Sequence, residues 1–220
     1  MIESKKKNQI RQLTYLAILT AIVVALQFAG SFIRLGTFSI SLVLVPIVIG
    51  VAVCNFAAGA WLGAAFGITV FLSGDASFFF SLNPFGTIVT VMLKGILCGL
   101  IAGIVYKVLS KVNQYFAIFV SAVVCPVVNT GIFLIGCRIF FWDFIISSAN
   151  ENSVSPVAFL FLFLIGGNFI FELLFNIVLC PTILKIVNLV DHTRNNGKTD
   201  TKKDSKESVS SESDEKTDNN

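Results

Sequence analysis

Charged residues are almost absent from the long middle of this chain, between Leu13 and Leu184. That stretch carries nine of them: Arg34, Asp75, Lys94, Lys107, Lys111, Arg138, Asp143, Glu151 and Glu172. Over all 220 residues, 13% are charged and 55% hydrophobic. A typical soluble domain has about 25% charged residues. Because so little charge leaves almost no polar surface to offer water, the sequence predicts an integral membrane protein.

Six apolar stretches approach the length that crosses a bilayer. A helix rises about 1.5 Å per residue, so a hydrocarbon core of about 30 Å needs about 20 residues. The stretches are continuous rather than alternating, which favours helices over a transmembrane barrel. They cover residues 13–33, 38–53, 56–73, 86–106, 115–138 and 157–187. We therefore expect an all-α membrane protein, a bundle of six transmembrane helices in which 38–53 is short and tilted or partly interfacial.

The placement of lysine and arginine predicts the orientation, because both are enriched in cytoplasmic loops. One side of the membrane receives Lys5, Lys6, Lys7, Arg11, Lys107, Lys111, Lys185 and Arg194. With six spans both termini lie on that side, which we predict to be the cytoplasm. Residues 1–12 then form a basic cytoplasmic N-terminus, and residues 13–190 form the transmembrane domain. The polar tail 191–220 cannot bury a core and is expected to be disordered. The loops 73–85 and 142–156 face outward.

Three spans carry small residues at four-residue spacing, which keeps the side chains on one helix face. Such a stripe is a smooth groove for another backbone. The stripes are Ala17, Ala21 and Ala25; Gly59, Gly63 and Gly67; and Gly95, Gly99 and Gly103. We expect intramolecular packing for the two glycine stripes. For the alanine stripe, packing within the chain and docking of a partner subunit remain equally open.

Ionisable groups at membrane depth are energetically costly and are candidates for function. Lys94 lies inside the fourth span, Glu172 inside the sixth, and Arg138 at the outer end of the fifth. Polar asparagines accompany them: Asn129, Asn168 and Asn176. The sequence predicts a solute pocket among spans four to six. A structural alternative remains open, in which Lys94 and Glu172 neutralise each other and Arg138 extends to the interface.

The chain lacks the motifs of several function classes. It has no P-loop, no H-E-x-x-H and no G-x-S-x-G, and its one histidine, His192, lies in the polar tail. Its five cysteines are isolated within apolar runs, and its basic residues are juxtamembrane. We therefore expect no catalytic residue, no metal site, no cofactor and no nucleic-acid partner.

Several segments resemble the substrate-binding S components of energy-coupling factor (ECF) vitamin importers. They are the Ala17-x-x-x-Ala21 step, SLVLVPIVIGVAVCNFAAGAWLGAAFG (Ser41–Gly67), VNTGIF (Val128–Phe133) and NFIFELLFNIVLCP (Asn168–Pro181). The last two are similar to the branch that holds the pantothenate and folate S components. The resemblance covers roughly residues 10–190.

The resemblance implies a substrate-capture subunit of an ABC importer in the bacterial plasma membrane. S components bind a vitamin from outside, and dock on a transmembrane T component that two ABC ATPases drive. Ala17, Ala21 and Ala25 would form the docking face. The implied substrate-binding residues are Asn83, Lys94, Asn129, Arg138, Asn168 and Glu172, of which Asn83 lies in a gating loop. Lys94 or Arg138 would pair with an anionic group of the solute, and pantothenate is the favoured solute.

Two other classes remain open from the sequence. A stand-alone ion-coupled carrier or channel would use Glu172 as its ion or proton site. An intramembrane enzyme would have to rely on Lys94 or Glu172 alone, and no motif supports it.

Overall fold

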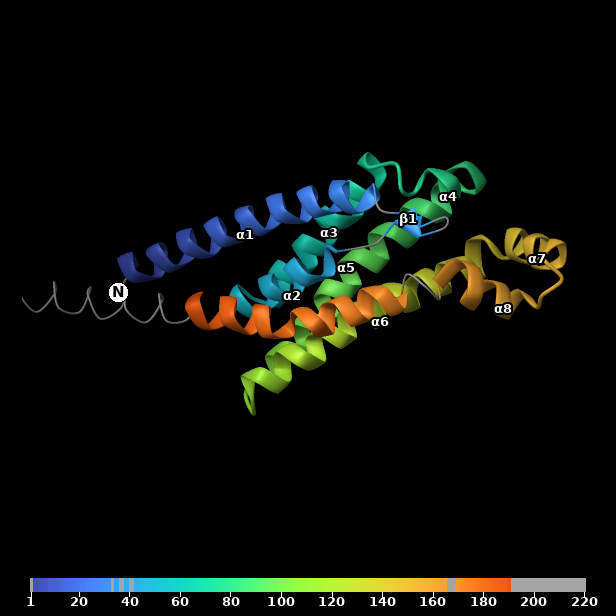
Figure 1. The fold of residues 1–220 in the computed structure, drawn as a ribbon. Helices are drawn as coiled ribbons and strands as arrows, with labels where there is room; N and C mark the ends of the chain where they lie inside the picture. Colours follow the sequence, from blue (N-terminus) through green and yellow to red (C-terminus); the bar gives the residue numbers. More distant parts are fainter. Residues whose placement is uncertain (1, 33, 36–37, 40–41, 166–168, 191–220) are drawn as a thin grey trace, which may run out of the picture. The chain divides into compact units, whose positions relative to one another are not determined.

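The computed structural model describes residues 2–32, 34–35, 38–39, 42–165 and 169–190 (Figure 1). The chain divides into two units, Met1–Leu184 and Lys185–Asn220. The first contains all the candidate functional residues. The expected disordered tail, 191–220, and the expected site residue Asn168 lie outside the described residues.

The described part of the chain is helical apart from turns and one short antiparallel ladder. Its elements are α1 (Ile2–Ser31), β1 (Arg34–Leu35), β2 (Phe38–Ser39), α2 (Leu44–Val53), α3 (Phe56–Leu72), α4 (Ser77–Leu82), α5 (Pro84–Leu109), α6 (Gln114–Phe140), α7 (Trp142–Glu151), α8 (Pro156–Phe159), a π-helix (Leu160–Ile165) and a last helix (Phe169–Val190). In the ladder, Arg34 pairs with Ser39 and Leu35 with Phe38.

Four helices among the described residues are long and apolar enough to cross a membrane. They are Gln9–Ser31, Pro84–Leu109, Gln114–Phe140 and Phe169–Val190. The apolar helices α2 and α3 have 10 and 17 residues, which correspond to about 15 Å and 26 Å. The chain is therefore a multi-pass membrane protein of helical class.

Two of the expected spans differ from the helices observed. The stretch expected at 38–53 begins with β2, and its helix starts only at Leu44. Pro46 lies in the first turn of that helix, where a backbone N–H has no intrahelical partner to lose. The stretch expected at 157–187 begins with α8 and the π-helix, and the last helix is described from Phe169. A continuous apolar run therefore does not guarantee one regular helix.

The segments 73–85 and 142–156, expected as loops, contain the short helices α4 and α7. Asn83 and Pro84 suggested a loop, but together they start α5. The Asn83 side chain accepts a hydrogen bond from the Gly86 N–H at 2.9 Å, and Pro84 occupies the first helical turn.

The two glycine stripes bring α3 and α5 together backbone to backbone. A Cβ atom at Gly63 would collide with the carbonyl oxygen of Gly95, and one at Gly59 would collide with that of Gly99. Packing within the chain, as expected for these stripes, therefore uses both of them. On its other side α5 packs along α6, and α1 packs on α2 and α3.

The alanine stripe of α1 is placed differently. Ala17, Ala21 and Ala25 are exposed, whereas Leu19, Val23 and Gln27 on the opposite side of α1 are buried. This alanine face has no packing role within the described part of the chain.

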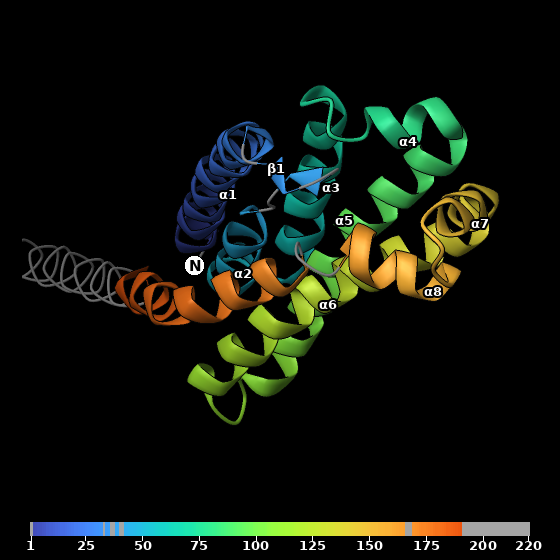
Figure 2. The ribbon, with the colours of Figure 1, turned by 45° about the vertical axis from the view of Figure 1, so that its right-hand side comes forward.

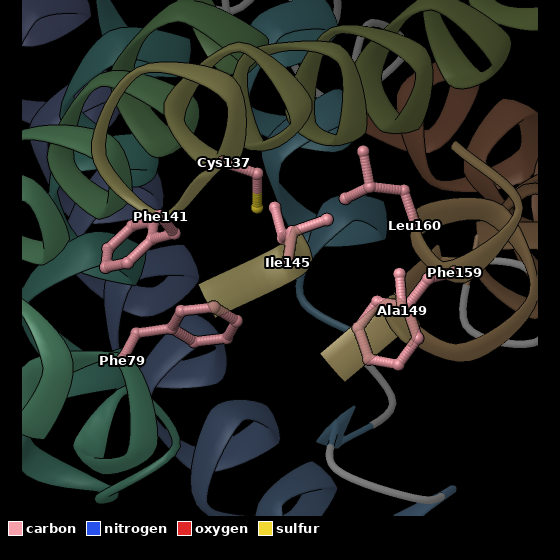
Figure 3. Packing of buried hydrophobic residues seen from close by; sticks show 7 residues of the cluster. All are labelled: Phe79, Cys137, Phe141, Ile145, Ala149, Phe159 and Leu160. Atoms are coloured by element: carbon pink, nitrogen blue, oxygen red, sulfur yellow. The ribbon is translucent and has the colours of Figure 1, made fainter. Parts of the chain in front are cut away.

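An aromatic cluster joins the short helices at one end of the first unit. Figures 1 and 2 show α4, α7 and α8 at the end opposite the start of α1. Seven buried residues form this cluster (Figure 3): Phe79, Cys137, Phe141, Ile145, Ala149, Phe159 and Leu160. The Phe79 ring centroid lies 5.0 Å from that of Phe141 and 5.5 Å from that of Phe133. These edge-to-face contacts fix α4 against α6.

Candidate functional site

Lys94 places an ammonium group among aromatic rings in the middle of α5. It lies ten residues after Pro84, or about 15 Å along the helix. Its Nζ atom is 5.6 Å from the ring centroid of Phe66 on α3 and 5.6 Å from that of Phe133 on α6. Both rings are within the range of a cation–π interaction. Lys94 is half-buried, so its charge stands in largely apolar surroundings.

Two acidic groups act electrostatically on the Lys94 ammonium. The stronger is Glu172 on the last helix, which is 3% exposed, and the weaker is Asp75 in the turn before α4. Asp75 in turn accepts a hydrogen bond of 2.6 Å from Nε2 of Gln27 on α1. The Lys94 ammonium is thus within electrostatic range of two carboxylates from different parts of the chain.

Asn129 of α6 lies at the level of Lys94. The register follows from a contact between the antiparallel helices: Ser121 Oγ donates a hydrogen bond to the Ala102 carbonyl at 3.1 Å. Two helical turns further along each helix, the same register pairs Asn129 with Lys94. Phe133, one turn beyond Asn129, contacts the Lys94 ammonium and agrees with this register.

Three buried side-chain oxygens have no hydrogen-bond partner within the described residues. They are Oδ1 of Asn129, Oδ1 of Asn176 and Oγ1 of Thr90, from residues that are 5%, 1% and 3% exposed. Asn176 lies one turn beyond Glu172 on the same face of the last helix. Such orphaned groups are rare in folded proteins and call for an explanation.

The structure therefore brings together three of the expected site residues, Lys94, Asn129 and Glu172, from three different helices. Glu172 acts electrostatically on Lys94 and on Cys125, which is one turn from Asn129. The cluster combines a positive charge, a carboxylate and an amide side chain from three helices. Among the described residues, no group of three or more His, Cys, Asp and Glu side chains lies close enough to hold a metal ion.

Two other expected site residues lie apart from this cluster. Arg138 is exposed in the last turn of α6, and its guanidinium carbon is 4.3 Å from the ring centroid of Trp142. It lies nine residues beyond Asn129, or about 14 Å along the helix. Asn83 is half-buried and caps α5.

Sequence reasoning missed Gln27, Asp75 and Thr90 as neighbours of the site. Asp75 lies in a turn, and a carboxylate there is common on any surface. Gln27 continues the four-residue stripe of Leu19 and Val23 on one face of α1, and this spacing was the available signal for a buried polar contact.

Comparison with known proteins gives one match. The family model described as "ECF transporter, substrate-specific component" matches residues 11–184. No curated protein and no solved structure matches the chain. The matched range includes the Lys94 cluster and most of α1. The chain therefore belongs to the family of substrate-specific components of ECF transporters.

Proposed function

We propose that this chain is the substrate-capture (S) subunit of an ECF-type ABC importer in the bacterial plasma membrane. It binds a water-soluble vitamin or related small carboxylate from the outside, with pantothenate favoured by the likeness of its fifth and sixth spans. The observation that carries the proposal is the Lys94 ammonium, held among two rings and polar groups inside a chain of this family.

The solute carboxylate pairs with Lys94 in this proposal, and Asn129, Asn168 and Glu172 complete the pocket. In this proposal the solute carboxylate displaces Asp75 from the neighbourhood of the ammonium, while Glu172 keeps its place. This exchange lets an anion enter a site that already contains carboxylates.

The proposed topology has six spans, with α2 and α3 completing the four longer helices and with both termini in the cytoplasm. The basic residues near the start of α1 and the end of α5 support this orientation. The end with α4 and α7 then faces outward. Asn83 and α4 form the gate over the pocket, and Arg138 is an outer contact for the incoming solute.

The exposed alanine face of α1 is the proposed docking face for a transmembrane T component, which two ABC ATPases energise. Ala17, Ala21 and Ala25 are all exposed, and small side chains allow a partner helix to approach closely. The chain has no P-loop of its own, so uptake needs the ATPases.

The burial of Glu172 supports one alternative. A carboxyl group 3% exposed within a membrane helix can bind an ion or a proton. The chain would then be a stand-alone carrier or channel driven by an ion gradient.

Direct binding tests the proposal. We expect the purified chain in lipid nanodiscs to bind one compound from a panel of pantothenate, folate, riboflavin and niacin, in a saturable one-to-one titration. Absence of binding to every member of the panel would refute the capture of a vitamin from this set.

A further inference from the structure

The unpartnered oxygens near Lys94 carry information about the part of the solute that is not its carboxylate. Resting on the proposed function above, we propose that the solute presents at least two hydrogen-bond donors, hydroxyl or amide N–H groups, to Asn129 and Asn176. These two asparagines are then specificity-determining residues, and Asn176 extends the site one helical turn beyond Glu172.

The first step of the argument is the chemistry of the orphaned atoms. Oδ1 of Asn129 and Oδ1 of Asn176 are carbonyl oxygens, which accept hydrogen bonds and cannot donate them. Both residues are at least nine-tenths buried, and neither oxygen has a partner within the described residues. No donor among the described residues satisfies them, and we assign this role to donors of the solute.

The second step is their position. Asn129 lies level with Lys94 by the register of α5 and α6, which the Ser121–Ala102 hydrogen bond and the Phe133–Lys94 contact define. Asn176 lies one turn from Glu172 on the same face of the last helix. Each acceptor is therefore beside a residue of the proposed pocket. Asn176 lies about 6 Å along the last helix from Glu172.

Thr90 is weaker evidence for a donor on the solute than the two asparagines are. Its hydroxyl packs against Gly136 at the contact between α5 and α6, and a hydroxyl can rotate to donate as well as accept. The inference therefore depends on the two asparagines alone.

The two asparagines should make binding selective for solutes that carry hydrogen-bond donors. A site that is built to hydrogen-bond its substrate strongly rejects analogues that lack the group, because its own polar atoms are then left buried and unpaired. A carboxylate without donors would meet two unsatisfied carbonyl oxygens. We expect such a compound to bind at least about tenfold more weakly for each missing donor.

Isothermal titration of the full chain in nanodiscs, with three probes, tests this. Pantothenate has a carboxylate, two hydroxyls and an amide N–H. Its didehydroxylated analogue lacks the hydroxyls, and nicotinate has a carboxylate but no donor. We expect pantothenate to bind at least about tenfold more tightly than the other two.

Variants of Asn129 and Asn176 test whether these two residues cause the preference for pantothenate. Asn129→Leu and Asn176→Leu keep the branching and the number of side-chain heavy atoms but remove the amide. They should reduce the preference for pantothenate over its didehydroxylated analogue to about threefold or less. Asn176→Asp keeps the acceptor and should retain the preference. Asn150→Leu, at an exposed position of α7, is the control and should leave it unchanged.

The outcomes distinguish the requirement for solute donors from the proposed capture of a carboxylate. If the didehydroxylated analogue or nicotinate binds as tightly as pantothenate, the donor requirement is wrong while capture of a carboxylate stands. If the Leu variants fold, by size-exclusion profile, and keep the full preference, the asparagines are structural and the inference is wrong. Binding of no probe at all overturns the pantothenate-like carboxylate proposal itself, and the inference with it.

Discussion

Gln27 and Asp75 connect the first helix to the surroundings of Lys94. Nε2 of Gln27 donates a hydrogen bond to Oδ2 of Asp75 at 2.6 Å and a second one to Oγ of Ser73 at 3.3 Å. Asp75 acts electrostatically on Lys94. Gln27 and the exposed alanines lie on opposite faces of α1. The helix proposed to dock on the partner is therefore tied directly to the neighbourhood of the proposed solute.

Removal of this tie should loosen α1. We expect Gln27→Leu to lower the free energy of unfolding by about 1–2 kcal/mol, because a buried hydrogen bond to a carboxylate is lost. Thermal unfolding in detergent measures the change. Gln9→Leu, at an exposed position of the same helix, is the matched control and should change stability by less than about 0.5 kcal/mol. An equal loss in both variants would mean that the Asp75 contact does not hold the helix.

The glycine contact between α3 and α5 should tolerate no side chain. Gly63→Ala and Gly95→Ala each force a methyl group into the facing backbone carbonyl, so we expect losses of about 1–3 kcal/mol. Gly131→Ala is the control, because a Cβ atom there meets nothing within 4 Å. Thermal unfolding of the three variants checks the order. Comparable destabilisation by Gly131→Ala would show that helix flexibility, and not close packing, requires these glycines.

A double substitution should separate the role of Lys94 in solute binding from its role in stabilising the fold beside Glu172. Lys94→Met removes the proposed partner of the solute and should weaken carboxylate binding about 100-fold or more. It also removes a positive charge that acts on the buried Glu172 carboxylate, and should lower stability by about 3 kcal/mol. Lys94→Met combined with Glu172→Gln should recover most of that stability and none of the binding. Titration and thermal unfolding of the same samples separate these effects, and full binding by the double variant would contradict the proposed pairing.

Arg138 should affect how fast the solute arrives more than how tightly it is held. Its exposed guanidinium lies against Trp142, away from the buried cluster, and an outer charge chiefly steers encounter. We expect Arg138→Gln to lower the association rate constant about 3- to 10-fold at low salt and to leave the dissociation rate unchanged. Stopped-flow fluorescence measures both. Lys107→Gln, near the other end of α5, should change neither, and faster dissociation in Arg138→Gln would place the arginine in the pocket.

Bulk on the alanine face should separate capture from transport. We expect Ala21→Phe to bind solute with unchanged affinity but to lose most uptake in cells that express the T component and both ATPases, because a large ring blocks the approach of a partner helix. Val178→Phe, at an exposed position of the last helix, is the control and should transport normally. Unimpaired uptake by Ala21→Phe would remove this face from the docking surface.

Charge and length predicted most of the helices, because the cost of burying a backbone or a charge in lipid allows few alternatives. The fourth and fifth stretches, expected at 86–106 and 115–138, lie within α5 and α6. The two glycine stripes, on α3 and α5, pack against each other. The helices α4 and α7 were missed, because short helices with asparagine and proline at their borders have the composition of loops.

The site was predictable only in part. Intramembrane charge singled out Lys94 and Glu172, and spacing along α6 gave the depth of Asn129. The approach of Asp75 and Phe66 to Lys94 depends on how α3 and the turn after it pack against α5. No local pattern encodes such a tertiary contact. The residue types of Arg138 and Asn83 suggested that both belong to the pocket. Arg138 instead lies about 14 Å from Asn129 along α6, and Asn83 lies at the start of α5.

Uptake into proteoliposomes tests the central claim most directly. The chain is reconstituted alone, or with the T component and two ATPases, and the labelled compound identified by the binding panel is supplied outside. The account predicts accumulation only in the complete assembly with ATP on the ATPase side, and none in response to a pH or sodium gradient. Gradient-driven accumulation by the chain alone, abolished by Glu172→Gln, would contradict it and establish a stand-alone carrier.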